Sequence, residues 1–158
     1  MTTRRMKTAA LFLSIATLHG LAMAALPLDV AHAQEAPAAA SLTITFQGIT
    51  KASGEIRGQL FSSEASYGGK GEAVTVFAIP VTGASVSVTV PGLAPGQYAV
   101  KAFHDVDGDG KMGANPFGMP TEPYAFSNNA KGAFGPAPWS AAAFEVAPGE
   151  AAHAITID

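Results

Sequence analysis

The sequence contains no cysteine and little charge. Without cysteine among its 158 residues, the chain can form neither a disulfide framework nor a thiolate zinc site, and it has no cysteine nucleophile. Charged residues make up 13% of the chain and hydrophobic residues 48%, which is apolar enough for a chain of this length to fold as one domain. Such a domain depends on its apolar core alone.

The N-terminus has the pattern of a secretion signal. Three basic residues near the start precede an uncharged stretch at residues 9–28, and residues 31–33 (Ala-His-Ala) match what a signal peptidase recognises. We therefore expect a cleavable signal at residues 1–33, with residues 22–24 as a second cleavage site, and export by the general secretory route. The mature protein is then secreted or periplasmic.

A membrane anchor is the alternative for this segment, because about 20 apolar residues span a bilayer. His19, Gly20, Pro27 and the many alanines argue against it. Cleavage after Ala33 leaves six basic and eleven acidic residues, a net charge of −5. This balance disfavours nucleic acid as a partner, and the mature chain has no apolar run long enough to span a membrane.

Residues 34–40 are expected to form a flexible lead, and residues 41–158 a β-sandwich domain. Apolar residues alternate with polar ones in short runs separated by glycine and proline, which is typical of strands and turns. The predicted strands lie at residues 42–46, 56–60, 74–78, 86–90, 98–103, 144–146 and 155–157. About seven strands over this length predict a single all-β antiparallel sandwich, immunoglobulin-like or transthyretin-like.

Fourteen apolar side chains in these runs are expected to point inward. They are Leu42, Ile44, Phe46, Ile56, Leu60, Val74, Val76, Val86, Val88, Tyr98, Val100, Phe144, Ile155 and Ile157.

Residues 105–140 interrupt the strand pattern. They contain five prolines and five aromatic residues but no predicted strand. A connection of this length in a compact domain is usually functional or disordered, and its aromatic content argues against disorder. We expect an ordered long loop packed over one end or face of the sandwich.

Several motifs in this region resemble a known family. Residues 95–105 read PGQYAVKAFHD, an acidic loop follows, and residues 117–129 read FGMPTEPYAFSNN. In this order they resemble a bacterial family of exported proteins catalogued as domain of unknown function 2141, over most of residues 41–158. The resemblance implies a small secreted all-β domain and no particular activity. Where this chain has Met119, the family often has Ile or Val.

The acidic loop is the first candidate site. Asp105, Asp107 and Asp109 occupy positions 1, 3 and 5 of an EF-hand-like loop, and Gly110 occupies position 6. Carboxylates at alternate positions converge on a hard cation such as calcium, and the glycine permits the sharp turn. The backbone carbonyl of Lys111 would then supply position 7.

The calcium pattern is incomplete. Position 12 is Pro116, where a bidentate glutamate should stand, although Asn115 or Glu122 offers a replacement oxygen. The alternative is an ordinary turn, since aspartate and glycine favour turns without any ion. Three carboxylates this close repel one another unless they are neutralised, which favours the ion.

His104 is the candidate catalytic residue. It precedes the acidic loop and could act as a general base beside Asp105 or Glu122. However, Ser127 lacks the setting of a nucleophile elbow, and no other paired nucleophile is evident. A hydrogen-bonded structural histidine at a strand end is the alternative.

The aromatic residues of the long loop are a candidate binding patch. Phe117, Tyr124, Phe126 and Trp139 either cap the core or stay exposed to bind a protein, peptide or carbohydrate ligand. Taken together, the sequence predicts an exported non-catalytic module with a binding or structural role, stabilised by calcium if the acidic loop binds it. The alternatives are a periplasmic hydrolase that uses His104 and a carrier of a small ligand, which would need a cavity.

Overall fold

The computed structural model describes residues 38–158, so the predicted signal at residues 1–33 lies outside the described residues. Eight strands form two sheets in this part of the chain. The strands are β1 (Ala40–Gln47), β2 (Glu55–Phe61), β3 (Thr75–Pro80), β4 (Ser85–Leu93), β5 (Gly96–Asp105), β6 (Tyr124–Phe126), β7 (Phe144–Val146) and β8 (Gly149–Thr156). Three short helical segments complete them: α1 (Glu64–Tyr67), η1 (Ser127–Asn129) and α2 (Trp139–Ala142).

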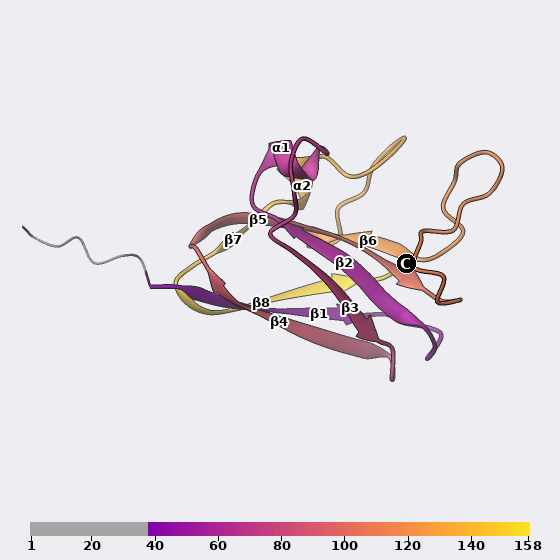
Figure 1. Cartoon of the computed structure of the whole chain (residues 1–158), viewed down its shortest axis with the longest axis horizontal. Helices are drawn as coiled ribbons and strands as arrows, with labels where there is room; N and C mark the ends of the chain where they lie inside the picture. The colour runs from indigo at the N-terminus through magenta and orange to yellow at the C-terminus, as the bar shows by residue number, and fades with distance from the viewer. Residues whose placement is uncertain (1–37) are drawn as a thin grey trace, which may run out of the picture. The chain divides into compact units, whose positions relative to one another are not determined.

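The two sheets are stacked as a sandwich, as predicted (Figure 1). One sheet has the order β4-β1-β8, and the other has the order β3-β2-β5-β6, with β7 also paired to β5. One pairing departs from the antiparallel prediction, because β1 and β8 run parallel over their whole length. Parallel strands cannot be joined by a hairpin, and none is needed here, because the strand that precedes β8 in the chain belongs to the opposite sheet.

The main core lies between the sheets. Leu42, Ile44 and Phe46 of β1 are fully buried, and they pack against residues of the opposite sheet such as Ile56 and Leu60. The alternation of buried and half-buried residues along β1 follows the period of two that the sequence shows. Of the fourteen predicted core residues, ten are buried, while Val88 and Phe144 are half-buried against the same core.

The prediction for β3 assigned the wrong set of alternate residues to the core. Val74 and Val76 are exposed, at 45% and 68%, and Thr75, Phe77 and Ile79 turn inward instead. The ring of Phe77 lies 5.8 Å from that of Phe46 in the facing sheet. Both alternating sets of this strand are apolar, so the pattern by itself did not decide which set faces the core.

The prediction of a strandless segment at residues 105–140 was also wrong. It contains β6, which pairs with β5, as well as η1 and the start of α2. β6 was not predicted because a strand of three residues is too short to show alternation. The strand predicted at residues 86–90 is longer than expected, since β4 continues through Pro91 and Gly92 to Leu93, with an irregularity in its pairing with β1.

A second, smaller cluster covers part of the outer face of the five-stranded sheet. Phe61 of β2 and Ala99 of β5 pack there against Tyr67 of α1 and Ala142 of α2. The rings of Tyr67 and Trp139 meet edge to face, with centroids 5.8 Å apart. The two short helices therefore cover one end of this face and leave the rest of it open.

None of the helices within residues 38–158 has the length and apolar character needed to span a bilayer.

Candidate functional site

The outer face of the five-stranded sheet carries two rows of side chains. Strand register places Val76, Gln59, Lys101 and Phe126 side by side across β3, β2, β5 and β6. The next row, one step along the strands, consists of Ala78, Arg57, Phe103 and Tyr124. Because alternate residues of a strand share a face, these rows are fixed by the same register that buries the core on the other side.

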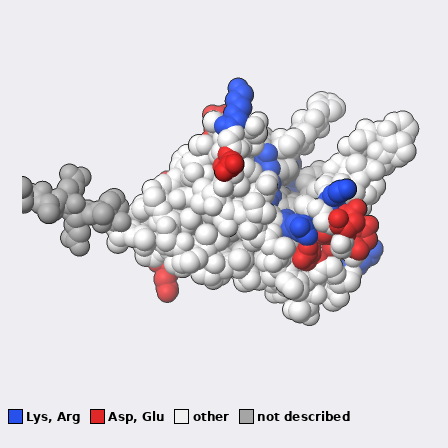
Figure 2. All heavy atoms as spheres, in the orientation of Figure 1, with Lys and Arg blue, Asp and Glu red and all other residues white. Residues whose placement is uncertain are grey.

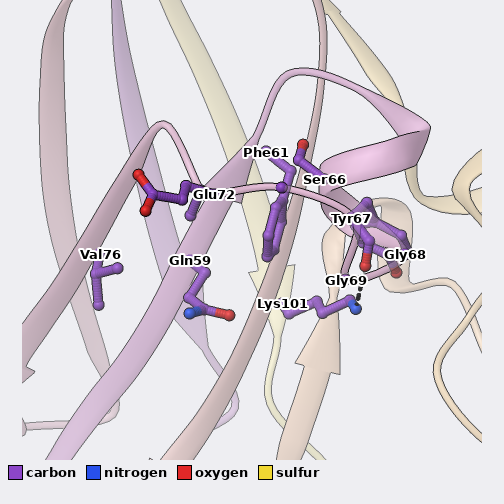
Figure 3. A pocket seen from close by; sticks show the side chains of 11 residues that line it. Gln59, Phe61, Ser66, Tyr67, Gly68, Gly69, Glu72, Val76 and Lys101 are labelled. Carbon is purple, nitrogen blue, oxygen red and sulfur yellow. Dashed lines mark hydrogen bonds between the residues drawn. The ribbon is translucent and has the colours of Figure 1, made fainter.

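A cavity of about 590 Å³ lies where α1 approaches this face. We call it the helix cavity. Its floor is formed by Gln59, Val76 and Lys101, and its walls by Phe61 and Tyr67 together with residues 68, 69 and 71–73 after α1. Figure 3 shows Lys101 pointing toward Tyr67. Glu72 lies on the opposite side of the cavity, and its carboxylate points away from Lys101.

A second cavity of about 420 Å³ lies between the same sheet and the acidic loop. We call it the loop cavity. Gln59, Val76 and Lys101 line it as well, and Tyr124 and Phe126 of β6 lie on another side. Because the two cavities share three floor residues, we treat them as one sheet groove that crosses the face from α1 to the acidic loop.

Lys101 lies at the centre of the sheet groove. Its Nζ donates a hydrogen bond to the backbone carbonyl of Tyr67 at 2.6 Å. The same nitrogen lies 4.1 Å from the centre of the Tyr67 ring and 5.4 Å from that of Phe61, so both rings attract its charge. Burial lowers the pKa of Lys101 below its ordinary value, because desolvation disfavours the charged form.

Arg57 is the other cation of the groove, and it is already paired. Its guanidinium forms a salt bridge with Glu55 and lies 3.7 Å from a carboxylate oxygen of the fully buried Asp105. This arrangement links the start of β2 to the end of β5. Arg57 therefore compensates the buried aspartate, and little of its charge is left for a ligand.

The acidic loop is held by its own hydrogen bonds. Asp105 accepts N–H bonds from Gly108 and Gly110, each at 2.8 Å. Asp107 accepts one from the backbone of Asp109, and Asp109 accepts one from that of Lys111. These are the turn bonds that aspartate commonly makes. Figure 2 shows acidic side chains gathered on this part of the surface, beside basic ones.

These carboxylates fit a cation in part. One oxygen from each of Asp105, Asp107 and Asp109 lies within 4.8 Å of the others. A carboxylate has about four acceptor positions, so one or two N–H bonds do not exhaust it. Glu122 contributes less, because its two oxygens accept N–H bonds from Val106 and Gly113. Asn115 likewise uses its side-chain oxygen within its own turn, for two backbone N–H groups.

His104 is buried and faces neither cavity. Only 1% of its surface is exposed, and its Nε2 lies 2.7 Å from the carbonyl oxygen of Ser53, to which it donates. Its backbone N–H bonds to Pro123. His104 thus connects β5 to the turn before β2 and to the residue before β6 through hydrogen bonds. No carboxylate of the described residues is bonded to its ring.

The Ser-Asn-Asn segment of η1 joins several elements. Ser127 is fully buried, and its Oγ accepts the N–H of Val100 and donates to the carbonyl of Ala142. Asn128 has a positive φ of 58° and donates two side-chain bonds to carbonyls at α2. Asn129 accepts the N–H of Thr156 in β8. These residues satisfy backbone groups, so their contribution is structural.

The four residues of the predicted aromatic patch have different environments. Phe117 is 90% exposed at the tip of the loop between β5 and β6, and Tyr124 is partly exposed beside the groove. Phe126 is buried and contributes to the groove wall, whereas Trp139 is half-buried against Tyr67. Two of the four residues, Phe126 and Trp139, therefore pack against the domain, and the other two, Phe117 and Tyr124, are exposed.

Sequence reasoning did not single out Gln59, Lys101 or Tyr67. The period-two pattern places Gln59 and Lys101 on the outward side of their strands, where a polar residue is ordinary. What distinguishes Lys101 is the approach of α1, which brings the carbonyl and the ring of Tyr67 to its ammonium group. No sequence signal available here predicts that approach, since α1 is a single helical turn.

A comparison with family models gives one match. The model described as Uncharacterized protein conserved in bacteria (DUF2141) matches residues 44–154, from within β1 to within β8. The matched region includes both cavities and the acidic loop. No curated protein and no solved structure matches the chain.

Proposed function

The chain belongs to the bacterial family of uncharacterized proteins DUF2141, and on the geometry of its sheet groove we propose that it is an exported, non-catalytic binding module. In this proposal the ligand lies in the groove across β3, β2, β5 and β6. The rest of the sandwich is the rigid support that keeps the floor of the groove in register.

The observation that carries the proposal is the pair of adjoining cavities on one face. Their volumes, about 590 and 420 Å³, lie in the range of small-molecule sites. The floor combines an amide, an ammonium and an apolar side chain, and the walls include aromatic rings as well as small and polar residues. A few polar groups among apolar surfaces are what a ligand site needs for orientation and affinity.

The arrangement of the candidate catalytic residues supports a non-catalytic role. A general base must reach the proton that it removes, and His104 is buried against a backbone carbonyl. The hydroxyl of Ser127 is engaged at both its donor and acceptor sides by backbone groups. A hydrolase that uses His104 would need a rearrangement of β2 and β5 to open a path to it.

Export is proposed on the N-terminal pattern of the sequence. Mass spectrometry of the protein purified from the periplasm or the medium should find the N-terminus at Gln34, or at Ala25 if the second site is used. An intact Met1 in a membrane fraction would overturn this part of the proposal.

Calcium binding by the acidic loop stays a hypothesis alongside the groove. Its support is the convergence of the carboxylates of Asp105, Asp107 and Asp109. The ion would stabilise the loop that forms one wall of the groove, so its role would be structural.

Binding in the groove can be tested without knowing the ligand. A library of small organic fragments is titrated into the ¹⁵N-labelled mature protein, and amide shifts are followed by nuclear magnetic resonance. We expect ligands that shift the amides of Gln59, Phe61 and Lys101 together. Val76→Trp should block them, because Val76 is exposed and lines both cavities, so the larger ring fills the groove.

Val74→Trp is the matched control, since Val74 is also exposed but lines neither cavity. It should leave the shifts unchanged. Shifts that cluster elsewhere on the protein, or that survive Val76→Trp, would place the binding surface outside the groove and refute the proposal.

A further inference from the structure

The charge at the centre of the sheet groove lacks an anionic partner within the chain. An ammonium group has three N–H donors, and within residues 38–158 the only hydrogen bond of the Lys101 ammonium goes to the carbonyl of Tyr67. No carboxylate of the described residues lies within salt-bridge distance of it. A half-buried cation with unused donors that lines a cavity is well placed to bind an anion.

The position of this ammonium group is set by its surroundings. Tyr67 holds it from one side through a carbonyl and a ring face, and Phe61 presents a second ring. The stem of the lysine therefore does not have to be ordered when a ligand arrives, which reduces the entropy cost of binding. Gln59 is directly opposite Lys101 in the sheet and offers an amide to the same ligand group.

The other charges around the groove restrict the anion to a single negative charge. Arg57 is neutralised by Glu55 and Asp105, so Lys101 alone supplies a positive charge to the ligand. Glu72 lines the far side of the helix cavity. A doubly charged phosphate ester would have a single ammonium to balance two negative charges, whereas a carboxylate is matched by one lysine.

We propose that the sheet groove binds the carboxylate of an organic acid whose remaining part is apolar or aromatic, with Lys101 as the anchor of the carboxylate. This inference rests on the proposed function, since it names the chemistry of the ligand in that same groove. The apolar part of the ligand lies against Phe61 and Tyr67, and Gln59 donates to the second carboxylate oxygen. A free small acid and the C-terminus of a peptide both have this chemistry.

The test uses matched sets of ligands that differ only in the charged group. One set consists of 3-phenylpropionate, 3-phenylpropionamide and 3-phenylpropylamine, and a second of indole-3-acetate with its amide and its amine. Binding to the mature protein is measured from the amide shifts of the groove residues. The acids should bind at least about tenfold more tightly than the amides, because a charge-assisted hydrogen bond is lost in the amide.

Variants of Lys101 separate a ligand anchor from a merely structural lysine. Lys101→Met keeps the apolar stem and should weaken the acids at least about tenfold while leaving the affinity of the amides unchanged. Lys101→Arg keeps the charge and should retain the preference for acids. Circular dichroism and the unchanged amide spectrum of the remote β1–β4 pair confirm that each variant is folded.

A peptide arm identifies the source of the carboxylate. A tripeptide ending in phenylalanine is compared with the same peptide carrying a C-terminal amide. Tighter binding of the free peptide than of 3-phenylpropionate would assign the groove to peptide C-termini, and the reverse would assign it to free acids.

The outcomes distinguish the two proposals. Equal binding of acid, amide and amine in the groove would overturn the carboxylate inference and leave the proposed function standing. Preference for the amine, or acid binding unaffected by Lys101→Met, would also overturn the inference. No shift of groove amides by any member of the sets or of the fragment library would overturn both.

Discussion

Replacing Ser127 with alanine should cost more stability than any exposed serine substitution in this chain. The hydroxyl of Ser127 is fully buried and joins two backbone groups of different elements, the N–H of Val100 in β5 at 2.9 Å and the carbonyl of Ala142 in α2 at 2.5 Å. In Ser127→Ala both groups remain buried without a partner. Each such group costs about 1–3 kcal/mol, so we expect the two together to lower the free energy of unfolding by about 2–6 kcal/mol.

Urea unfolding measures this loss. Trp139 is the single tryptophan of the chain, and it stands at the start of α2, so its fluorescence reports on the elements that Ser127 joins. With a slope of about 2 kcal/mol per molar urea, the midpoint should fall by about 1–3 M. Far-ultraviolet circular dichroism should give the same midpoint if the sandwich unfolds in one step.

Ser87→Ala is the matched control. The Oγ of Ser87 bonds to that of Thr45 at an exposed position of the three-stranded sheet, where water can replace it. The control should change the free energy of unfolding by less than about 0.5 kcal/mol. An equally small change in Ser127→Ala would contradict this prediction, because it would show that the buried backbone groups find other partners.

Three further predictions follow from local features. Gly54→Ala and Gly92→Ala both place alanine at a positive φ, but only the Cβ at 54 would also collide with the backbone carbonyl that ends β5; urea unfolding should therefore show a larger loss at 54, and equal losses would contradict this. Burial lowers the pKa of His153 below 6.5, so its contribution to stability is complete above pH 6.5 and is lost as the pH falls through the lowered value. His153→Gln should consequently flatten the pH dependence of unfolding between about pH 7 and 5, and an unchanged slope would rule out this contribution. If the acidic loop binds calcium with the weak affinity of extracellular modules, about 10⁻⁴–10⁻³ M, calcium at ten times the dissociation constant adds about 1.4 kcal/mol. Thermal midpoints should then rise more with calcium than with magnesium and not at all in the double variant Asp107→Ala with Asp109→Ala, whereas identical midpoints in calcium and chelator would leave an ordinary turn.

The candidate site was predictable only where local chemistry decided the structure. A turn was one of the two interpretations of the Asp-Gly pattern, and the structure has one there, in which the side-chain carboxylate of Asp105 accepts the backbone N–H of Gly110. The same pattern also predicted calcium, which requires oxygens from elsewhere in the chain. Glu122 was named as one source. In the structure both of its carboxylate oxygens accept backbone N–H groups across the loop, and these contacts depend on the path of the folded loop.

The all-β class and most of the core could be predicted from the order of apolar and polar residues. Where one face of a strand is apolar and the other polar, as in β1, alternation assigns each side chain to a face, because burying the wrong set would expose the apolar one. β3 shows where this reasoning stops. Val76 and Phe77 are both apolar, and only packing against Phe46 of the other sheet decided which of them turns inward.

The groove, in contrast, arises from contacts between segments that are distant in the sequence. Gln59 and Lys101 come from positions that the pattern marks as ordinary outward residues, and they become neighbours through the register of β2 and β5. Tyr67 reaches Lys101 because one helical turn folds back over the sheet. Periodicity records which face a side chain occupies, but what lies opposite that face depends on contacts between distant segments, and those are set by the energy of the whole fold.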